Sequence, residues 1–278
     1  MLTQKTKDDW QKAFEKQMDI AEKPNIAKVK RYYKKEYNKG IQSFLSLNAT
    51  NYENTFLTAD FIKLYAEIYK SVGLRFAKWY ARNFDKYIKK GINPRQFESI
   101  WEQQFLFLGQ AIAARRVTLV SGTAKKTLRN IFRSLLSDQE FMQLGEQQQA
   151  RVLRRKFNRY SQTQAERLVR TESTLIANYA TMQSALSIFP GAQMKKEWIA
   201  SFDDRTRDAH AQADGQIVNY DDTFIVGVDF MKYPGDPAAS AENIINCRCS
   251  VAPFPDDFAE SITDIDNIGF GLSRQTTF

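Results

Sequence analysis

The segment 163–190, TQAERLVRTESTLIANYATMQSALSIFP, contains the change of pattern that decides the fold. Its apolar side chains recur at helical spacing and form one stripe, made by Leu168, Leu175, Tyr179, Met182 and Leu186. Pro190 ends this pattern, because proline has no backbone N–H and its ring clashes with a preceding helical turn. Two prolines precede position 190 and five lie from it onward. We therefore expect regular helices before residue 190 and short mixed elements after it.

Further helices are predicted upstream of this segment. Thr58 is a suitable N-cap residue for one helix, and Lys89-Lys90-Gly91 is typical of its end. Asn93-Pro94 begins the next helix. The sequences Ser137-Asp138-Gln139-Glu140 and Thr163-Gln164-Ala165-Glu166 both match the capping box and predict two more helix starts. The aromatic residues on these helices are interpreted as ordinary core.

Beyond residue 190 the apolar pattern becomes that of short strands. Asp236-Pro237 is a helix-start signal for a short helix over 238–243. Strands are predicted over 194–202, over 216–226 with a turn in the middle, and over 246–252. The predicted fold class is α+β, with a long, mainly α-helical N-terminal region followed by a small α+β C-terminal module with short antiparallel strands. The expected segments are a basic N-terminal helical arm (1–56), a helical domain (57–189), the small α+β module (190–256) and a C-terminal tail (257–278).

The charge is divided unevenly along the chain. The 278 residues carry 40 Lys and Arg and 32 Asp and Glu, and the net charge is +17 over residues 1–197 and −9 over residues 198–278. Such a positive region predicts a polyanion or an acidic protein as partner, unless the two regions neutralise each other internally. The candidate contact residues interleave with tyrosines near the N-terminus and are Lys30, Arg31, Lys34 and Lys35. The alternatives are a solvated helix face or an arm that packs on another subunit.

Several classes of protein are excluded or disfavoured by the sequence. It contains no G-x-x-x-x-G-K-S/T, no G-x-G-x-x-G and no G-x-S-x-G, which argues against the nucleotide-binding and serine hydrolase classes that these motifs define. The first residues lack the apolar core of a signal peptide, and no segment approaches the roughly 18 apolar residues of a membrane span. The two cysteines, Cys247 and Cys249, are too close for an unstrained disulfide on a strand. We expect a soluble protein that is made in a reducing cytoplasm.

The rare residues His210, Cys247 and Cys249 fall in the C-terminal module and suggest zinc, for which imidazole and thiolate are common ligands. A fourth ligand would come from water or from one of Asp203, Asp208 and Asp214. The alternative is that the thiols simply pack in the core and the imidazole bonds a backbone carbonyl. A cysteine nucleophile, with Asp204 or Asp208 orienting His210, is a further alternative. No cofactor is expected apart from this candidate zinc ion.

Glu172 lies on the apolar stripe of its helix and needs a partner, because burying a lone carboxylate is costly. We interpret it as part of a polar clasp that joins the helices to the C-terminal module, formed by Arg170, Glu172, Asp203, Asp204, Arg205, Arg207 and Arg248. The competing hypothesis is an effector enzyme in which Glu172, Arg205 and His210 share a cleft.

A succession of short motifs over about residues 150–255 resembles the phage Mu F-like head morphogenesis family. These motifs are Arg170-Thr171-Glu172, Trp198, Asp203-Asp204-Arg205-Thr206-Arg207-Asp208-Ala209-His210, Asp214-Gly215-Gln216, Phe224, Pro234-Gly235-Asp236-Pro237 and Asn246-Cys247-Arg248-Cys249. The resemblance implies a structural minor capsid protein of a tailed phage, located in the head and associated with the portal vertex. It acts there in procapsid assembly or in DNA packaging and ejection, and no enzymatic activity is implied. The implied partners are portal, capsid and scaffold proteins, with phage DNA as a further candidate.

The same resemblance bears on the metal. Some relatives have a pattern that looks like a four-ligand zinc site, with a Cys-x-x-Cys and a further histidine. Arg207 and Ile244 replace two of those ligands in this chain. An arginine–carboxylate network around Asp203, Asp204 and Arg205 is the expected substitute.

Overall fold

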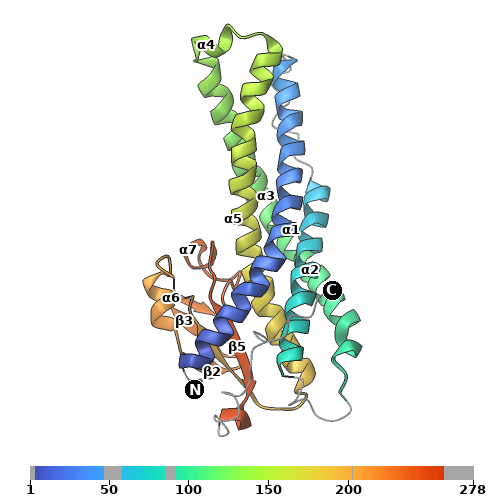
Figure 1. Cartoon of the computed structure of the whole chain (residues 1–278), viewed down its shortest axis with the longest axis vertical. Helices are drawn as coiled ribbons and strands as arrows, with labels where there is room; N and C mark the ends of the chain where they lie inside the picture. Colours follow the sequence, from blue (N-terminus) through green and yellow to red (C-terminus); the bar gives the residue numbers. More distant parts are fainter. Residues whose placement is uncertain (1–3, 47–57, 85–91, 202, 260–278) are drawn as a thin grey trace. The chain divides into compact units, whose positions relative to one another are not determined.

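The computed structural model describes residues 4–46, 58–84, 92–201 and 203–259 (Figure 1). The N-terminal part is helical, and its elements are α1 (Gln4–Leu45), α2 (Thr58–Asn83), the short 3-10 helix η3 (Pro94–Phe97), α3 (Glu98–Leu136), α4 (Gln139–Met142) and α5 (Glu146–Ile188). Among the described residues, no helix combines the length and the apolar composition that a membrane crossing needs.

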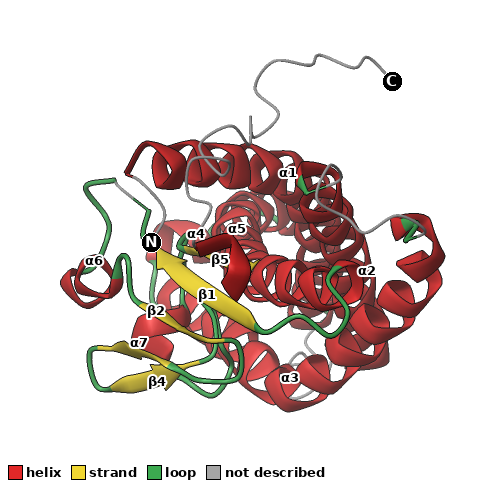
Figure 2. Ribbon diagram, turned by 90° about the horizontal axis from the view of Figure 1, so that it is seen from below, coloured by secondary structure: helices red, strands yellow, loops and turns green. Residues whose placement is uncertain are grey.

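The strands begin just after Pro190 and confirm the α+β class. The elements are β1 (Met194–Ile199), α6 (Asp208–Ala213), β2 (Ile217–Asn219), β3 (Phe224–Val226), β4 (Asp229–Met231), α7 (Ala241–Ile244), β5 (Ser250–Pro255) and the 3-10 helix η4 (Asp256–Ala259). β1 lies between β2 and β5 in an antiparallel sheet, as Figure 2 shows, and Trp198 pairs with Val251. β3 and β4 form a separate antiparallel hairpin in which Ile225 pairs with Phe230.

Contacts divide the chain into two compact units. The first unit comprises residues 1–23, 68–106 and 170–278, and the second comprises residues 24–67 and 107–169. This division differs from the segment boundaries expected from the sequence, because α1, α2, α3 and α5 each contribute one part to each unit. Composition changes along the chain, whereas contacts gather side chains from distant positions, so the two criteria do not draw the same boundaries.

The start of α1 is part of the core of the first unit. The Trp10 and Trp79 ring centroids are 4.9 Å apart, and those of Phe14 and Phe76 are 4.8 Å apart. Trp10 is 1% exposed, and its Nε1 donates a hydrogen bond of 3.1 Å to Ser250 Oγ at the start of β5. Residues 4–23 were expected in a basic arm, but their apolar face is buried against the other parts of the first unit.

The two capping boxes have different outcomes. Asp138 caps α4, since its Oδ1 accepts a hydrogen bond of 3.2 Å from Phe141 N. Thr163 does not begin a helix: it lies inside α5, and its Oγ1 donates to Arg159 O. The predicted helix start at Thr163 is therefore wrong. No proline or glycine stands between residue 146 and Thr163 to interrupt the helix, so the capping residues are not used as a cap.

Candidate functional site

A ladder of polar side chains on α5 holds the segment that leads into β5. Thr171, Thr174 and Asn178 follow at helical spacing and therefore lie on one face of the helix. Thr171 Oγ1 accepts a hydrogen bond of 3.1 Å from Asn246 N, and Thr174 Oγ1 donates to Cys247 O. The side chains of α5 thus bind the backbone of the cysteine segment residue by residue.

Asn178 makes the largest number of these contacts and is fully buried. Its Oδ1 accepts a hydrogen bond of 2.8 Å from Val251 N. Its Nδ2 donates to Pro234 O at 3.1 Å and to Cys249 O at 3.2 Å. A third acceptor for this amide is Thr174 O at 2.9 Å, within the same helix. One side chain therefore joins α5 to two separate loops of the C-terminal module.

The cysteines lie in a loop and not in a strand. The predicted strand over 246–252 is wrong at its start, because β5 begins at Ser250. Asn246 has a φ of 56°, in the left-handed region, which turns the chain before Cys247. Both thiols are nevertheless buried, each 2% exposed. The turn at Asn246 and the hydrogen bonds to α5 take the place of the expected strand ladder.

The two thiols and the imidazole of His210 form a buried cluster. His210, on α6, places its Nδ1 3.3 Å from Cys249 Sγ and 3.6 Å from Cys247 Sγ. Its Nε2 lies 3.3 Å from Asn243 Oδ1. The Asn243 amide is itself held, since its Nδ2 donates to Val226 O at 3.1 Å and to Asp229 at 2.8 Å. The imidazole is therefore oriented from the side opposite the thiols.

The contact between the thiols separates their acidities. The hydrogen bond from Cys249 lowers the pKa of the Cys247 thiol, although burial opposes this effect. The same hydrogen bond, together with burial, raises the pKa of Cys249 well above its ordinary value. Of the two thiols, Cys247 is therefore the more acidic.

The geometry of this cluster fits three ligands of a zinc ion. The three ligand atoms lie within 4.8 Å of one another. Ligand atoms around a tetrahedral zinc are about 3.5 Å apart, which matches the observed sulfur–nitrogen distances. Asn243 stands where an outer partner normally orients a ligating histidine. The residues present therefore fit part of a zinc site.

A fourth protein ligand does not join this group among the described residues. Asp203 binds Arg205 at 2.7 Å, Asp214 binds Lys7 at 2.6 Å, and Asp208 is exposed. A cavity of about 280 Å³ opens beside the cluster and is lined by Arg170, Arg205, Arg207, Arg248, His210, Cys247 and Cys249, among others. The fourth position therefore faces this cavity, and no further His, Cys, Asp or Glu among residues 4–46, 58–84, 92–201 and 203–259 completes the site.

These donors predict a measurable zinc content. We expect the protein to take up one zinc ion per chain after incubation with zinc, because three preorganised donors are present. The double substitution Cys247→Ser/Cys249→Ser should abolish this uptake, whereas Asp208→Asn should leave it unchanged. Elemental analysis by mass spectrometry after dialysis measures both. Protein that remains free of zinc under these conditions would show that the thiols only pack.

The arginines of the expected clasp gather on a carboxylate that the sequence analysis missed. Arg248 Nη2 lies 3.4 Å from Glu22 Oε2, and Arg170 Nε lies 3.9 Å from the same oxygen. Glu22 is 4% exposed, so burial raises its pKa while the two arginines oppose this rise. Glu22 lies on the same face of α1 as the buried residues Met18 and Asn25, and this spacing was the sequence signal for its burial.

Glu172 itself has a different partner from the expected arginines. It is 1% exposed, and its Oε2 accepts a hydrogen bond of 2.5 Å from Tyr69 Oη. Arg205 binds Asp203, and Arg207 donates to Ile245 O at 2.6 Å. Asp204 is exposed. The residues of the expected clasp are thus distributed over several contacts within the first unit.

The four basic residues proposed as contact residues near the N-terminus do not share one site. Lys35 pairs with Asp60 at 3.5 Å, and Arg31 Nε donates to Ala27 O at 3.3 Å. Lys34 is exposed and lines a cavity, and Lys30 is half-exposed. Only Lys34 of these four residues therefore contributes to a described cavity of the second unit.

Comparison with known proteins supports the resemblance. Residues 141–252 match the family described as "Phage Mu protein F like protein". The resemblance inferred from the short motifs is therefore confirmed over this part of the chain. No solved structure matches the chain significantly.

Two curated proteins are similar to the chain. The minor head protein GP7 of Bacillus phage SPP1 is 25% identical over 239 residues, which make up 85% of this chain and 67% of GP7. The NAD(+)–arginine ADP-ribosyltransferase EFV of Enterococcus faecalis is 30% identical over 105 residues, or 37% of this chain and 21% of that enzyme. The similarity to GP7 thus covers most of this chain, whereas the similarity to the enzyme covers about a fifth of the enzyme.

Proposed function

We propose that this chain is a structural minor component of a bacteriophage head, associated with the portal vertex and acting in procapsid assembly or in DNA packaging and ejection. The observation that carries this proposal is the similarity to a minor head protein over 85% of the chain. The match of residues 141–252 to the Mu F-like family supports it. The partners are then portal, capsid and scaffold proteins, and the protein moves from the host cytoplasm into the head.

The polar contacts of the first unit support a structural and not a catalytic role. Glu22 is buried and pairs with two arginines, and Asn178 is buried and hydrogen-bonded to backbone groups of the C-terminal module. Buried polar contacts of this kind hold the surrounding segments in one conformation. We propose that this network makes the C-terminal module a rigid surface for the other head proteins. The segments proposed from the sequence remain the basic arm (1–56), the helical domain (57–189), the α+β module (190–256) and the tail (257–278).

Presence in the head tests this proposal. Mass spectrometry of purified procapsids and virions of the source phage should detect the protein in few copies. Immobilised portal protein should retain it, whereas the major capsid protein alone should retain less. Its absence from purified heads would contradict the proposal.

The similarity to an ADP-ribosyltransferase favours a second candidate, an effector enzyme delivered with the genome. That hypothesis needs Glu172, Arg205 and His210 in one cleft. Arg205 and His210 line the cavity beside the thiols, but Glu172 is not among its lining residues and is hydrogen-bonded to Tyr69. Incubation with labelled NAD⁺ and arginine-containing proteins should therefore transfer no label. Transfer of label that is lost in Glu172→Gln protein of unchanged stability would establish the enzyme instead.

A further inference from the structure

Positive charge is concentrated in the second compact unit. Residues 24–67 and 107–169 carry 19 Lys and Arg against 8 Asp and Glu, a net charge of +11. The remaining residues carry 21 basic against 24 acidic groups, a net charge of −3. A unit with this imbalance attracts polyanions and repels other cationic surfaces. The first part of α1, residues 1–23, carries five basic and five acidic groups and belongs to the other unit, so it adds nothing to this charge.

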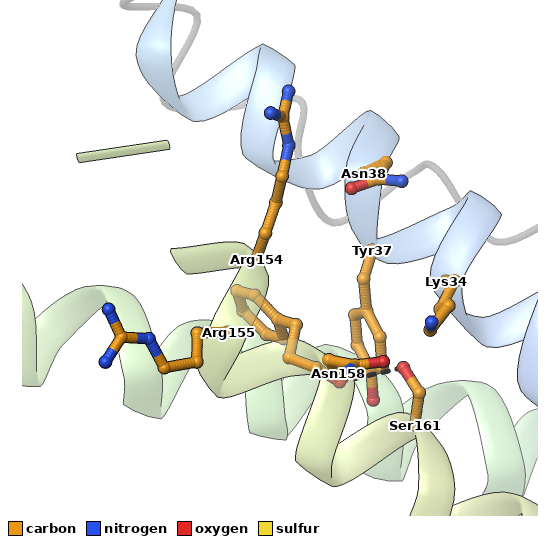
Figure 3. A pocket seen from close by; sticks show the side chains of 8 residues that line it. Lys34, Tyr37, Asn38, Arg154, Arg155, Asn158 and Ser161 are labelled. Carbon is orange, nitrogen blue, oxygen red and sulfur yellow. Dashed lines mark hydrogen bonds between the residues drawn. The ribbon is translucent and has the colours of Figure 1, made fainter. Parts of the chain in front are cut away.

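This unit contains a cavity with a cationic rim. The cavity has a volume of about 340 Å³, with Lys34 and Asn38 from α1 and Arg154, Arg155 and Asn158 from α5 at its rim (Figure 3). These five side chains are exposed, whereas the remaining lining residues Tyr37, Phe157 and Ser161 are buried. The rim therefore offers three cations and two amides, and no carboxylate lines the cavity.

The cations of the rim have no carboxylate partners within the described part of the chain. No ion pair there joins Lys34, Arg154 or Arg155 to an acidic residue, in contrast to Lys35, which pairs with Asp60. Glu36 is buried and pairs with Lys39 at 2.6 Å. Positive charges gathered without acidic neighbours repel one another, and a bound anion would remove this repulsion. The arrangement is that of an anion site whose counter-charge comes from outside the chain.

The aromatic residues that line the cavity do not offer a stacking surface. The Tyr37 ring stacks on Phe157 at 4.8 Å and on Tyr33 at 6.1 Å. Tyr33 and Tyr37 are 3% and 1% exposed, so their faces are used within the core. A nucleobase has no platform among the lining residues, and the contacts that they offer are those that bind phosphate: forked guanidinium groups, an ammonium group and amide N–H donors. Recognition of the backbone alone carries no sequence information.

We infer that this cavity binds the phosphate backbone of a nucleic acid without reading its bases. Arg154 and Arg155 contact phosphate oxygens through their guanidinium groups, Lys34 adds a point charge from α1, and Asn38 and Asn158 donate from the rim. This site goes beyond the proposed structural role, because it gives the protein a direct contact with the genome. In the sequence of α5, Arg151 and Arg159 flank these residues, and Lys156 lies between Arg155 and Asn158.

The salt dependence of DNA binding tests the site. Fluorescence anisotropy with a labelled random-sequence duplex should show that the observed affinity of the full chain falls steeply with salt. The slope of log affinity against log salt is negative, and each lost phosphate contact reduces its magnitude by about 0.9. The variant Lys34→Ala/Arg154→Ala/Arg155→Ala should therefore reduce the magnitude by about 2.7. A second variant, Arg154→Gln/Arg155→Gln, removes two charges but keeps polar side chains, and it should reduce the magnitude of the slope by about 1.8.

A matched control separates the cavity from general charge. Lys63→Ala/Arg115→Ala/Lys126→Ala removes the same number of charges from exposed positions of the second unit that do not line the cavity. It should change the slope by less than about 1. Equal losses in both triple variants would overturn the assignment, as would absence of DNA binding by the unsubstituted chain.

Two further comparisons decide the class of ligand. Poly-glutamate should compete weakly with DNA, and equal competition would assign the site to an acidic polypeptide instead. Duplexes of unrelated sequence should bind within a factor of a few, and a strong preference would overturn the backbone mode. The cavity variants should still enter phage heads, so a failure of this inference is distinguishable from a failure of the proposed structural role.

Discussion

Replacing Asn178 with alanine is expected to lower the free energy of unfolding by about 3–5 kcal/mol. The substitution leaves Val251 N and the carbonyls of Pro234 and Cys249 without this buried partner. Each buried polar group left unsatisfied costs about 1–3 kcal/mol, and the missing side chain adds a small cavity. Urea unfolding followed by tryptophan fluorescence measures the loss, because Trp198 lies in the adjacent sheet.

Two other substitutions define the cause of this loss. Asn158→Ala changes the same residue type on the same helix at an exposed position, and its effect should stay within about 0.5 kcal/mol. Asn178→Asp keeps the volume and one acceptor but directs a carboxylate at the carbonyls of Pro234 and Cys249, so it should destabilise as much as alanine. A small loss for both Asn178 variants would contradict the bridging role.

Replacing Gly235 with alanine should have a comparable effect, for a steric reason. Gly235 has a φ of 85°, and an added Cβ would lie 2.9 Å from both Leu175 Cα and Leu175 N, in the backbone of α5. The left-handed conformation alone costs an alanine about 1–2 kcal/mol, and the close contact with helix backbone should bring the total above about 3 kcal/mol. The backbone of α5 cannot move away without loss of the neighbouring hydrogen bonds from Thr174 and Asn178.

Gly191 provides a matched control for this substitution. It has a φ of 76°, but an added Cβ would meet nothing within 4 Å. Gly191→Ala should therefore cost only the conformational part, about 1–2 kcal/mol. Equal losses for the two alanine variants, in the same unfolding experiment, would show that the contact with α5 contributes nothing.

The change from helix to mixed structure was predictable because it depends on local signals. Pro190 ends the helical pattern, and the first strand begins at Met194. The helix start at residues 137–140 was predicted for the same reason, since a cap is satisfied within its own turn, although the capping residue is Asp138 and not Ser137. Thr163 carries the same signal but stands inside a continuous helix. A local signal is used only where the preceding residues leave the helix.

The contacts of the candidate site were less predictable because their partners are distant in sequence. The arginines near Glu172 were expected to bind it, yet Arg170 and Arg248 lie on Glu22. The grouping of His210 with both cysteines followed from their rarity, but the loop at Asn246 did not follow from alternation. The basic run from Arg151 to Arg159 was visible in the sequence and was overlooked in favour of the tyrosine-rich run near Lys30.

The hydrogen bond between Trp10 and Ser250 has a consequence for biosynthesis. Ser250 lies 240 residues after Trp10, so the first unit closes only after the ribosome has translated the segment up to β5. Until then, the apolar face of the first helix remains open to solvent or to a chaperone. An excised fragment limited to the Mu F-like residues would lack this helix, and its exposed core would favour aggregation.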